Sequence, residues 1–190
     1  ALSVLEKLWD AKYLARIRRN VGLFLLRTGK REAARTQIVA ALDAQTAAGG
    51  EDNVDVGVTR IALAQWHVEL YADAAELTEL VPTLTRLPKV VVDHLGMSQE
   101  GLPTLLKLVA HGVKVKATGF GRVSVDVVAA LKAIAEVDPH ALMFGTDLPS
   151  TRAPRPFAPA DIDLLRDALG EQQAQRALYD NAVAFYRPGP

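Results

Sequence analysis

The chain has 190 residues, of which 49% are hydrophobic, so it is long and apolar enough to bury a substantial core. Lysine and arginine together number 22, as do aspartate and glutamate, and this balance leaves no field of one sign to bind nucleic acid or an anionic membrane. The expected partner is therefore a small molecule. The absence of cysteine excludes disulfides, thiolate metal sites and nucleophilic-cysteine mechanisms.

The first residues, 1–10, have the pattern of an amphipathic helix rather than that of a signal peptide. No apolar run in the sequence approaches the ~20 residues that a membrane span needs. We therefore expect a cytoplasmic protein with no membrane partner.

Short β-rich runs alternate with longer segments of helical period, which favours βα units around a parallel sheet. Strands are predicted at 21–26, 66–71, 90–94, 113–118 and 142–147. Helices are predicted at 72–87, 102–110, 125–137 with Ser124 as N-cap, 161–169, and from 172 towards 186. Between the first two strands, an alanine-rich helical stretch leads to an exposed loop near 49–53. No linker or repeat divides the chain, so residues 1–190 are expected to form a single domain.

Period-two alternation within each strand assigns its side chains to one of two faces. The apolar residues of the second and fourth strands belong against helices, which leaves an inner polar stripe of His67, Glu69, Tyr71, Lys114, Lys116 and Thr118. Catalytic groups in barrel proteins cluster at the carboxyl ends of the strands. The first candidates for a site are therefore His94, Lys116 and Asp147, whereas His67 and Lys114 lie near the opposite ends and are expected to be structural.

Five segments carry a family resemblance through their order and spacing. They are WHVELY at 66–71, VVVDHLG at 90–96, VKATG at 115–119, FGTDLP at 144–149, and Asp-Asn-Ala at 180–182. Together they resemble the amidohydrolase-related family (amidohydrolase family 2), which includes lactonases similar to 2-pyrone-4,6-dicarboxylate lactonase. The resemblance implies an α/β fold of the (β/α)₈ TIM-barrel type that is incomplete, with about strands four to eight present and strands one to three absent. The run at 21–26 would be strand four, and a complete barrel takes about 250 residues.

The resemblance also implies a hydrolase, in which water attacks the carbonyl of a lactone or amide in a small carboxylated substrate. Asp147 would be the general base or a metal ligand, and His94 would polarise the carbonyl or bind the metal. The expected substrate-binding residues are Lys116, Tyr71, Arg152 and Arg155.

The family's His-x-His pair, which normally supplies two metal ligands from the first strand, is not found in this sequence. The four histidines, His67, His94, His111 and His140, are never two residues apart. The expected cofactor is therefore either one divalent metal such as Zn²⁺ or none.

Several alternatives remain open. One alternative is a related decarboxylase. Another is a catalytically silent barrel remnant or interaction module whose open sheet edges are covered by a partner or by a second copy in a homo-oligomer. The alternative role of Lys116 is only to neutralise Asp147 or a neighbouring carboxylate inside the barrel. An unrelated α/β binding domain would have helices on both faces of an open sheet and would not bring His94 and Asp147 together.

Overall fold

The computed structural model describes residues 11–49, 53–64 and 66–186, which divide into two compact units. The N-terminal unit contains the residues up to His67 together with Arg86–Pro88, and the C-terminal unit contains Val68–Thr85 and the residues from Lys89 onward. The helix predicted at 1–10 lies outside the described residues. Because two compact units of one chain can belong to one domain, the single domain stays a prediction.

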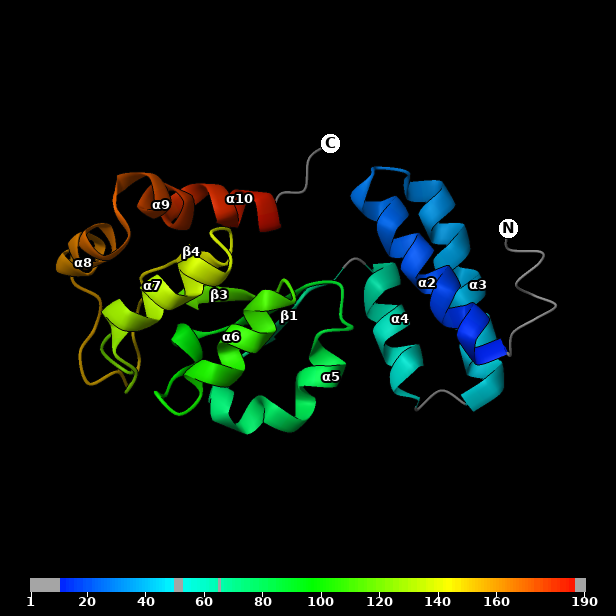
Figure 1. Cartoon of the computed structure of the whole chain (residues 1–190), viewed down its shortest axis with the longest axis horizontal. Helices are drawn as coiled ribbons and strands as arrows, with labels where there is room; N and C mark the ends of the chain where they lie inside the picture. The colour runs from blue at the N-terminus through cyan, green and yellow to red at the C-terminus, as the bar shows by residue number, and fades with distance from the viewer. Residues whose placement is uncertain (1–10, 50–52, 65, 187–190) are drawn as a thin grey trace. The chain divides into compact units, whose positions relative to one another are not determined.

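The N-terminal unit is helical, with α2 (Ala11–Arg27), α3 (Arg31–Gly49) and α4 (Val54–Ala64) (Figure 1). Helices α2 and α3 pack closely at Gly22, where an added Cβ atom would collide with Ile38. Arg19 is buried and its Nη1 atom lies 3.2 Å from the Asp55 carboxylate. Burial lowers the pKa of Arg19 to about 10.

The strand predicted at 21–26 is wrong, because these residues lie inside α2. A continuous apolar run fits a buried strand or a buried helix equally well, and its period alone does not separate them. The buried positions Ala15, Arg19 and Gly22 recur at helical spacing, so the run continues a helix that begins upstream. The segment expected to be barrel strand four is therefore helical.

The C-terminal unit contains one parallel sheet of four strands, in the order β1-β2-β3-β4. These strands are β1 (Val68–Leu70), β2 (Val90–Val92), β3 (Lys114–Ala117) and β4 (Leu142–Phe144). Each lies within a predicted strand. Because each strand pairs with the next along the chain, the connections all run in one direction, as in a TIM barrel and unlike a doubly wound sheet. The predicted class, an α/β fold with part of a TIM barrel, is confirmed.

The connections between the strands are helical. After β1 come η1 (Ala74–Leu80) and α5 (Val81–Leu84), after β2 come η2 (His94–Gly96) and α6 (Leu102–Ala110), and after β3 comes α7 (Val127–Val137). After β4 come α8 (Ala160–Leu169), α9 (Glu171–Gln175), the π-helical turn η3 (Arg176–Asp180) and α10 (Asn181–Tyr186).

Two details of these helices differ from the prediction. The helix expected at 72–87 is a 3₁₀ segment followed by the short α5, which has Pro82 in its first turn. The N-cap of α7 is Asp126 rather than Ser124, and its carboxylate accepts a hydrogen bond of 3.0 Å from the backbone N–H of Ala129. The Ser124 hydroxyl instead points towards the carbonyl of Met97, at 3.4 Å.

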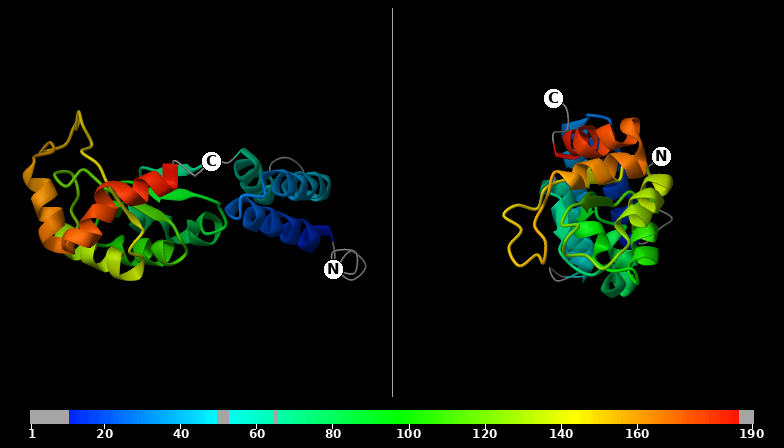
Figure 2. Two further views of the ribbon diagram at one scale, coloured as in Figure 1. Left: turned by 90° about the horizontal axis from the view of Figure 1, so that it is seen from above. Right: turned by 90° about the vertical axis from the view of Figure 1, so that its left-hand side faces the viewer.

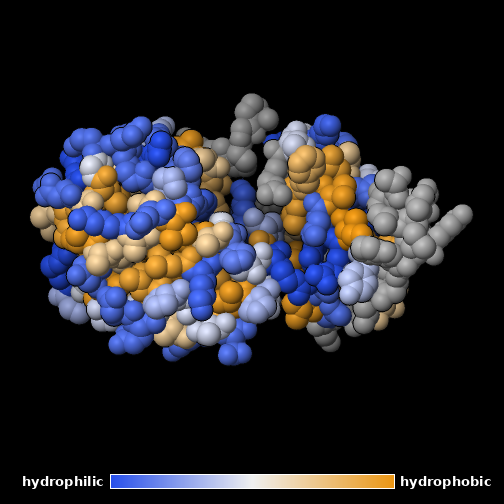
Figure 3. Space-filling view, viewed as in Figure 1, coloured by the Kyte–Doolittle hydropathy of each residue, from blue (hydrophilic) through white to orange (hydrophobic). Residues whose placement is uncertain are grey.

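The two faces of the sheet differ as the alternation predicted. In β3, Val115 and Ala117 are fully buried, whereas Lys114 and Lys116 on the opposite face are partly exposed. In Figures 1 and 2, α6 and α7 lie on one side of the sheet and α9 and α10 lie on the other. On the face seen in Figure 3, apolar residues gather over α6 and α7.

Helix α10 packs on the face that carries Lys116. Its Phe185 side chain joins a core cluster with Val91 and Met143. Asn181 donates a hydrogen bond of 2.8 Å from Nδ2 to the carbonyl oxygen of Leu142 in β4. Helices therefore cover both faces of this sheet, although a complete barrel would enclose the polar face as its interior.

None of the described helices is both long and apolar enough to cross a membrane. The cytoplasmic location stays a prediction.

Candidate active site

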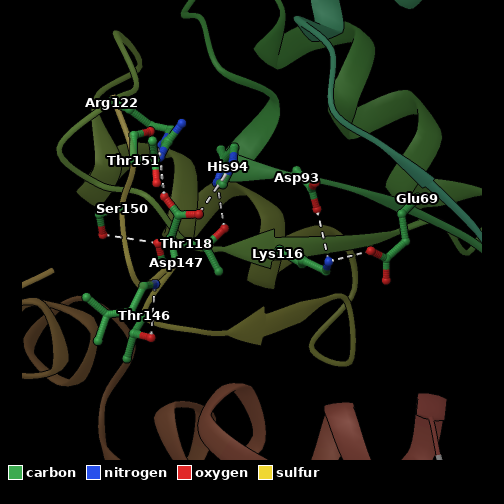
Figure 4. A network of polar contacts seen from close by, with 11 residues as sticks. Glu69, Asp93, His94, Lys116, Thr118, Arg122, Thr146, Asp147, Ser150 and Thr151 are labelled. Atoms are coloured by element: carbon green, nitrogen blue, oxygen red, sulfur yellow. Dashed lines mark hydrogen bonds and ion pairs between the residues drawn. The ribbon is translucent and has the colours of Figure 1, made fainter. Parts of the chain in front are cut away.

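The structure brings His94 and Asp147 together at the carboxyl ends of β2 and β4 (Figure 4). The Nε2 atom of His94 lies 4.0 Å from Oδ1 of Asp147, and the two side chains are only 9% and 21% exposed. Both residues have left-handed backbone conformations, with φ of 51° and 57°. Such conformations cost about 1–3 kcal/mol in non-glycine residues and cluster at functional sites. The predicted convergence of these two residues is observed.

Thr118, at the end of β3, holds the other side of the His94 ring. Its Oγ1 atom lies 2.8 Å from Nδ1 of His94, and both residues are buried. The next residue, Gly119, has a φ of +62°, and an added Cβ atom would lie 2.8 Å from the same nitrogen. The loop can therefore approach the imidazole this closely only because residue 119 is glycine.

Arg122 lies on the far side of Asp147. Its Nη2 atom is 2.7 Å from Oδ2 of Asp147 and donates a hydrogen bond of 3.3 Å to the carbonyl of Thr151. The backbone N–H of Ser150 donates to the carbonyl of Asp147 at 2.7 Å and closes the turn that presents the carboxylate. Asp147 is therefore held between an imidazole and a guanidinium.

Sequence reasoning missed Arg122 and gave Thr118 no role. The available signal was weak: Thr118 was expected on the inner face, and Arg122 follows the Gly119-Phe120-Gly121 turn directly after that strand. Neither spacing indicates that the loop after β3 reaches the end of β4.

The environment favours a neutral imidazole at His94. Burial lowers its pKa from 6.5, and the charge of Arg122 acts in the same direction. The carboxylates of Asp147 and Asp93 oppose this shift but do not outweigh it. At neutral pH one ring nitrogen is therefore a hydrogen-bond donor and the other an acceptor.

Tyr71 stands at the edge of the site, as expected from its place at the end of β1. Its ring meets the His94 ring edge-on, with centroids 5.3 Å apart, and the residue is 64% exposed. This position leaves much of the phenol accessible to a bound molecule.

Lys116 does not contact Asp147. Its Nζ atom lies 2.7 Å from Oε2 of Glu69 and 3.2 Å from Oδ1 of Asp93 (Figure 4). Burial opposes the charge on Lys116, but the hydrogen bond to Glu69 and the charge of Asp93 outweigh this effect and raise its pKa. Tyr186 of α10 also donates to Glu69, at 2.8 Å. The ammonium is thus matched by carboxylates of the chain itself, and its substrate-binding role stays a prediction.

The two arginines expected in the loop after β4 are placed differently from one another. Arg155 binds Asp161 through two nitrogens, at 2.7 and 3.1 Å. The hydrogen bond to Asp161 raises the pKa of Arg155. Arg152 is exposed and has a left-handed φ of 66°. Among the described contacts, neither side chain touches His94 or Asp147.

A divalent metal does not fit the residues present. Catalytic zinc sites normally take three protein ligands, whereas His94 and Asp147 supply two. No group of three histidine, aspartate or glutamate residues within the described ranges could hold a metal ion. One oxygen of Asp147 also already faces the Arg122 guanidinium. The described residues alone therefore do not make a metal centre.

The chain is similar to known proteins along nearly its whole length. A family model described as Amidohydrolase matches residues 4–187, while no curated protein matches. The apo crystal structure of an Agrobacterium tumefaciens protein is similar, with 25% sequence identity and a TM-score of 0.59. The match covers 79% of this chain and 66% of that protein, so this chain spans just under two thirds of that protein's length. Because the family model covers nearly every residue, the chain belongs to the amidohydrolase family.

Proposed function

We propose that this chain carries the hydrolytic site of an enzyme that cleaves a lactone or amide bond in a small carboxylated substrate. Membership of the amidohydrolase family supports a hydrolase-type function. The single observation that carries the proposal is the gap of 4.0 Å between His94 Nε2 and Asp147 Oδ1 at the strand ends. Two polar atoms at this separation can both hydrogen-bond one water molecule at about 2.8 Å.

In this mechanism, Asp147 is the general base for the attacking water. The water donates one hydrogen bond to Asp147 Oδ1 and the other to the neutral His94 ring, which aims its oxygen lone pair at the substrate carbonyl. As the oxygen attacks the carbonyl carbon, Asp147 takes the proton. The bond to the leaving oxygen or nitrogen then breaks, and that atom receives the proton. Arg122 orients the carboxylate through its other oxygen.

Two features support a carboxylated substrate. The Arg122 guanidinium lies beside Asp147 on a side chain that is 14% exposed, so its positive charge would attract a bound acid. Arg152 is exposed on the loop after β4, where its guanidinium is accessible to the same acid. Lys116 and Arg155 are less suited, because carboxylates of the chain already hold them.

The rim of the site suits a flat or partly apolar molecule. Tyr71 beside His94 is 64% exposed, and Leu148 next to Asp147 is 61% exposed. Aromatic and aliphatic surfaces beside convergent polar groups are typical of small-molecule sites.

The test is a panel of small lactones and amides, each with and without a free carboxylate, assayed for hydrolysis with and without added Zn²⁺. We expect turnover of a carboxylated member, and a loss of at least about 100-fold in kcat for Asp147→Asn. His94→Asn should also be impaired, whereas Asp163→Asn and His140→Asn, at exposed positions, should match the wild type. Equal rates for the wild type and Asp147→Asn would disprove the mechanism.

A second candidate is an interaction module without activity. One observation favours it: α10 covers the polar face of the sheet, with Phe185 packed on Val91 and Met143. If the wild type hydrolyses no member of the panel, this candidate replaces the enzyme.

A further inference from the structure

We propose that Thr118 is a positioning residue that fixes His94 as the Nδ1–H tautomer and so turns the lone pair of Nε2 towards Asp147. The inference rests on the proposed function for its consequence, because an acceptor at Nε2 is what orients the attacking water. The tautomer itself is a physical property of the ring and is measurable without a substrate.

The geometry on the Thr118 side supplies a partner for an Nδ1–H donor. The distance of 2.8 Å between Nδ1 and Oγ1 is that of a good hydrogen bond, and the hydroxyl oxygen can accept it. Both residues are 7% exposed, so bulk water does not compete for this nitrogen. A backbone hydrogen bond with Thr118 also favours the protonated ring.

The geometry on the Asp147 side does not supply a partner for an Nε2–H donor. The separation of 4.0 Å between Nε2 and Oδ1 is too long for a direct hydrogen bond. In the alternative tautomer, the Nε2–H group would have no direct partner among the described residues and would donate to the water, which could then no longer donate to the ring. With the proton on Nδ1, the ring donates to Thr118 and leaves Nε2 free to accept from water.

Close packing keeps the ring from turning over and exchanging its nitrogens. A Cβ atom on Gly119 would lie 2.8 Å from Nδ1, which shows how tightly the loop is packed against the imidazole. A Cβ atom on Gly145 would lie 3.0 Å from Cγ2 of Thr118, so β4 also restricts the threonine rotamer. Tyr71 packs edge-on against the ring. These contacts support one orientation of His94.

The experiment is a long-range ¹H–¹⁵N spectrum of the whole chain, labelled with ¹⁵N-histidine and recorded above pH 7.5, where His94 is neutral. In the wild type, we expect a protonated, pyrrole-type signal from Nδ1 and an unprotonated, pyridine-type signal from Nε2. The reverse assignment would overturn the proposal, and this wild-type measurement does not depend on any variant folding.

Variants then test whether Thr118 is the cause. Thr118→Val removes the hydroxyl at nearly constant volume and should give a mixture of tautomers, while Thr118→Ser should restore the single Nδ1–H form. Thr36→Val, at an exposed position on α3, is the matched control and should leave the His94 signals unchanged. A Thr118→Val spectrum identical to that of the wild type would show that the hydroxyl does not set the tautomer.

A kinetic readout separates this inference from the proposed function. Once a substrate that the wild type hydrolyses has been identified, Thr118→Val should lower kcat by about 10- to 100-fold with little change in KM. This is the effect expected for loss of a residue that orients a histidine of the site. If the tautomer is as expected but no substrate is hydrolysed, the proposed function fails and the assignment to Thr118 stands. If hydrolysis depends on Asp147 but the tautomer is reversed, only the inference about Thr118 fails.

Discussion

Lys116 on β3 reaches Glu69 on β1, at 2.7 Å, although β2 lies between these two strands. Asp93, which directly follows β2, lies 3.2 Å from the same ammonium. The side chain therefore ties three strands together on the polar face of the sheet.

Replacing Lys116 with methionine should destabilise the C-terminal unit by about 1 kcal/mol, because the partly buried carboxylate of Asp93 and the exposed carboxylate of Glu69 lose their cation. Urea unfolding followed by circular dichroism measures the change. Glu69→Gln, which keeps a hydrogen-bond acceptor, should cost less. If Lys116→Met unfolds at the wild-type urea concentration, the three-strand contact is not stabilising and a substrate-binding role for Lys116 gains support.

Asn181→Ala should cost about 1–3 kcal/mol, because it leaves the buried carbonyl of Leu142 without its side-chain donor. The same unfolding experiment applies, with Asn20→Ala at an exposed position of α2 as the control. Hydrogen exchange in α10 should become faster in Asn181→Ala. Unchanged exchange there would mean that Phe185 alone holds the helix in place.

From the ion pair between Lys114 and Asp138, we predict that the stability of the folded chain falls at acidic pH. Burial opposes the charge on Asp138, but hydrogen bonds from the backbone N–H of His140 and from Lys114 outweigh it and lower its pKa. A pKa that is lower in the folded than in the unfolded state gives stability that is present above about pH 4 and is lost as the pH falls through the folded-state pKa.

Unfolding measured from pH 6 down to pH 2 should therefore show a steeper loss of stability for the wild type than for Asp138→Asn. Asp163→Asn serves as the control and should follow the wild type. Parallel curves for the wild type and Asp138→Asn would contradict the role of this ion pair.

Removing each of the two charged neighbours of His94, Arg122 and Asp147, should shift the pKa of His94 in opposite directions. NMR of the ring protons should give a wild-type pKa below 6.5. Arg122→Gln removes a positive charge and should raise the pKa of His94, whereas Asp147→Asn removes a negative charge and should lower it. A shift in the same direction for both variants would mean that a change in burial, rather than charge, controls the titration.

The sequence predicted the strands of the sheet because each has a β-branched or alternating pattern bounded by proline, glycine or a change of period. The strand predicted at 21–26 was wrong, because the same kind of apolar run lies there within α2. Only tertiary packing decides between strand and helix for such a run. The cap of α7 moved from Ser124 to Asp126 for a related reason, since both residue types cap well and the backbone selects one.

At the site, position along a strand was sufficient to bring His94 and Asp147 together. It was insufficient for Lys116, whose partner Glu69 lies 47 residues away on a strand that is not its neighbour. Arg122 reaches the site through a loop, and loop paths depend on φ angles such as that of Gly119 rather than on periodicity.

The strand order also bears on how the C-terminal unit folds. Each strand pairs with the next one along the chain, so each pairing needs only one further βα step of the sequence. The contact between Tyr186 and Glu69 instead joins residues 117 positions apart. During synthesis, the sheet can therefore grow one βα step at a time, while α10 docks only after the last strand has left the ribosome. The polar face of the sheet is therefore uncovered until that final step.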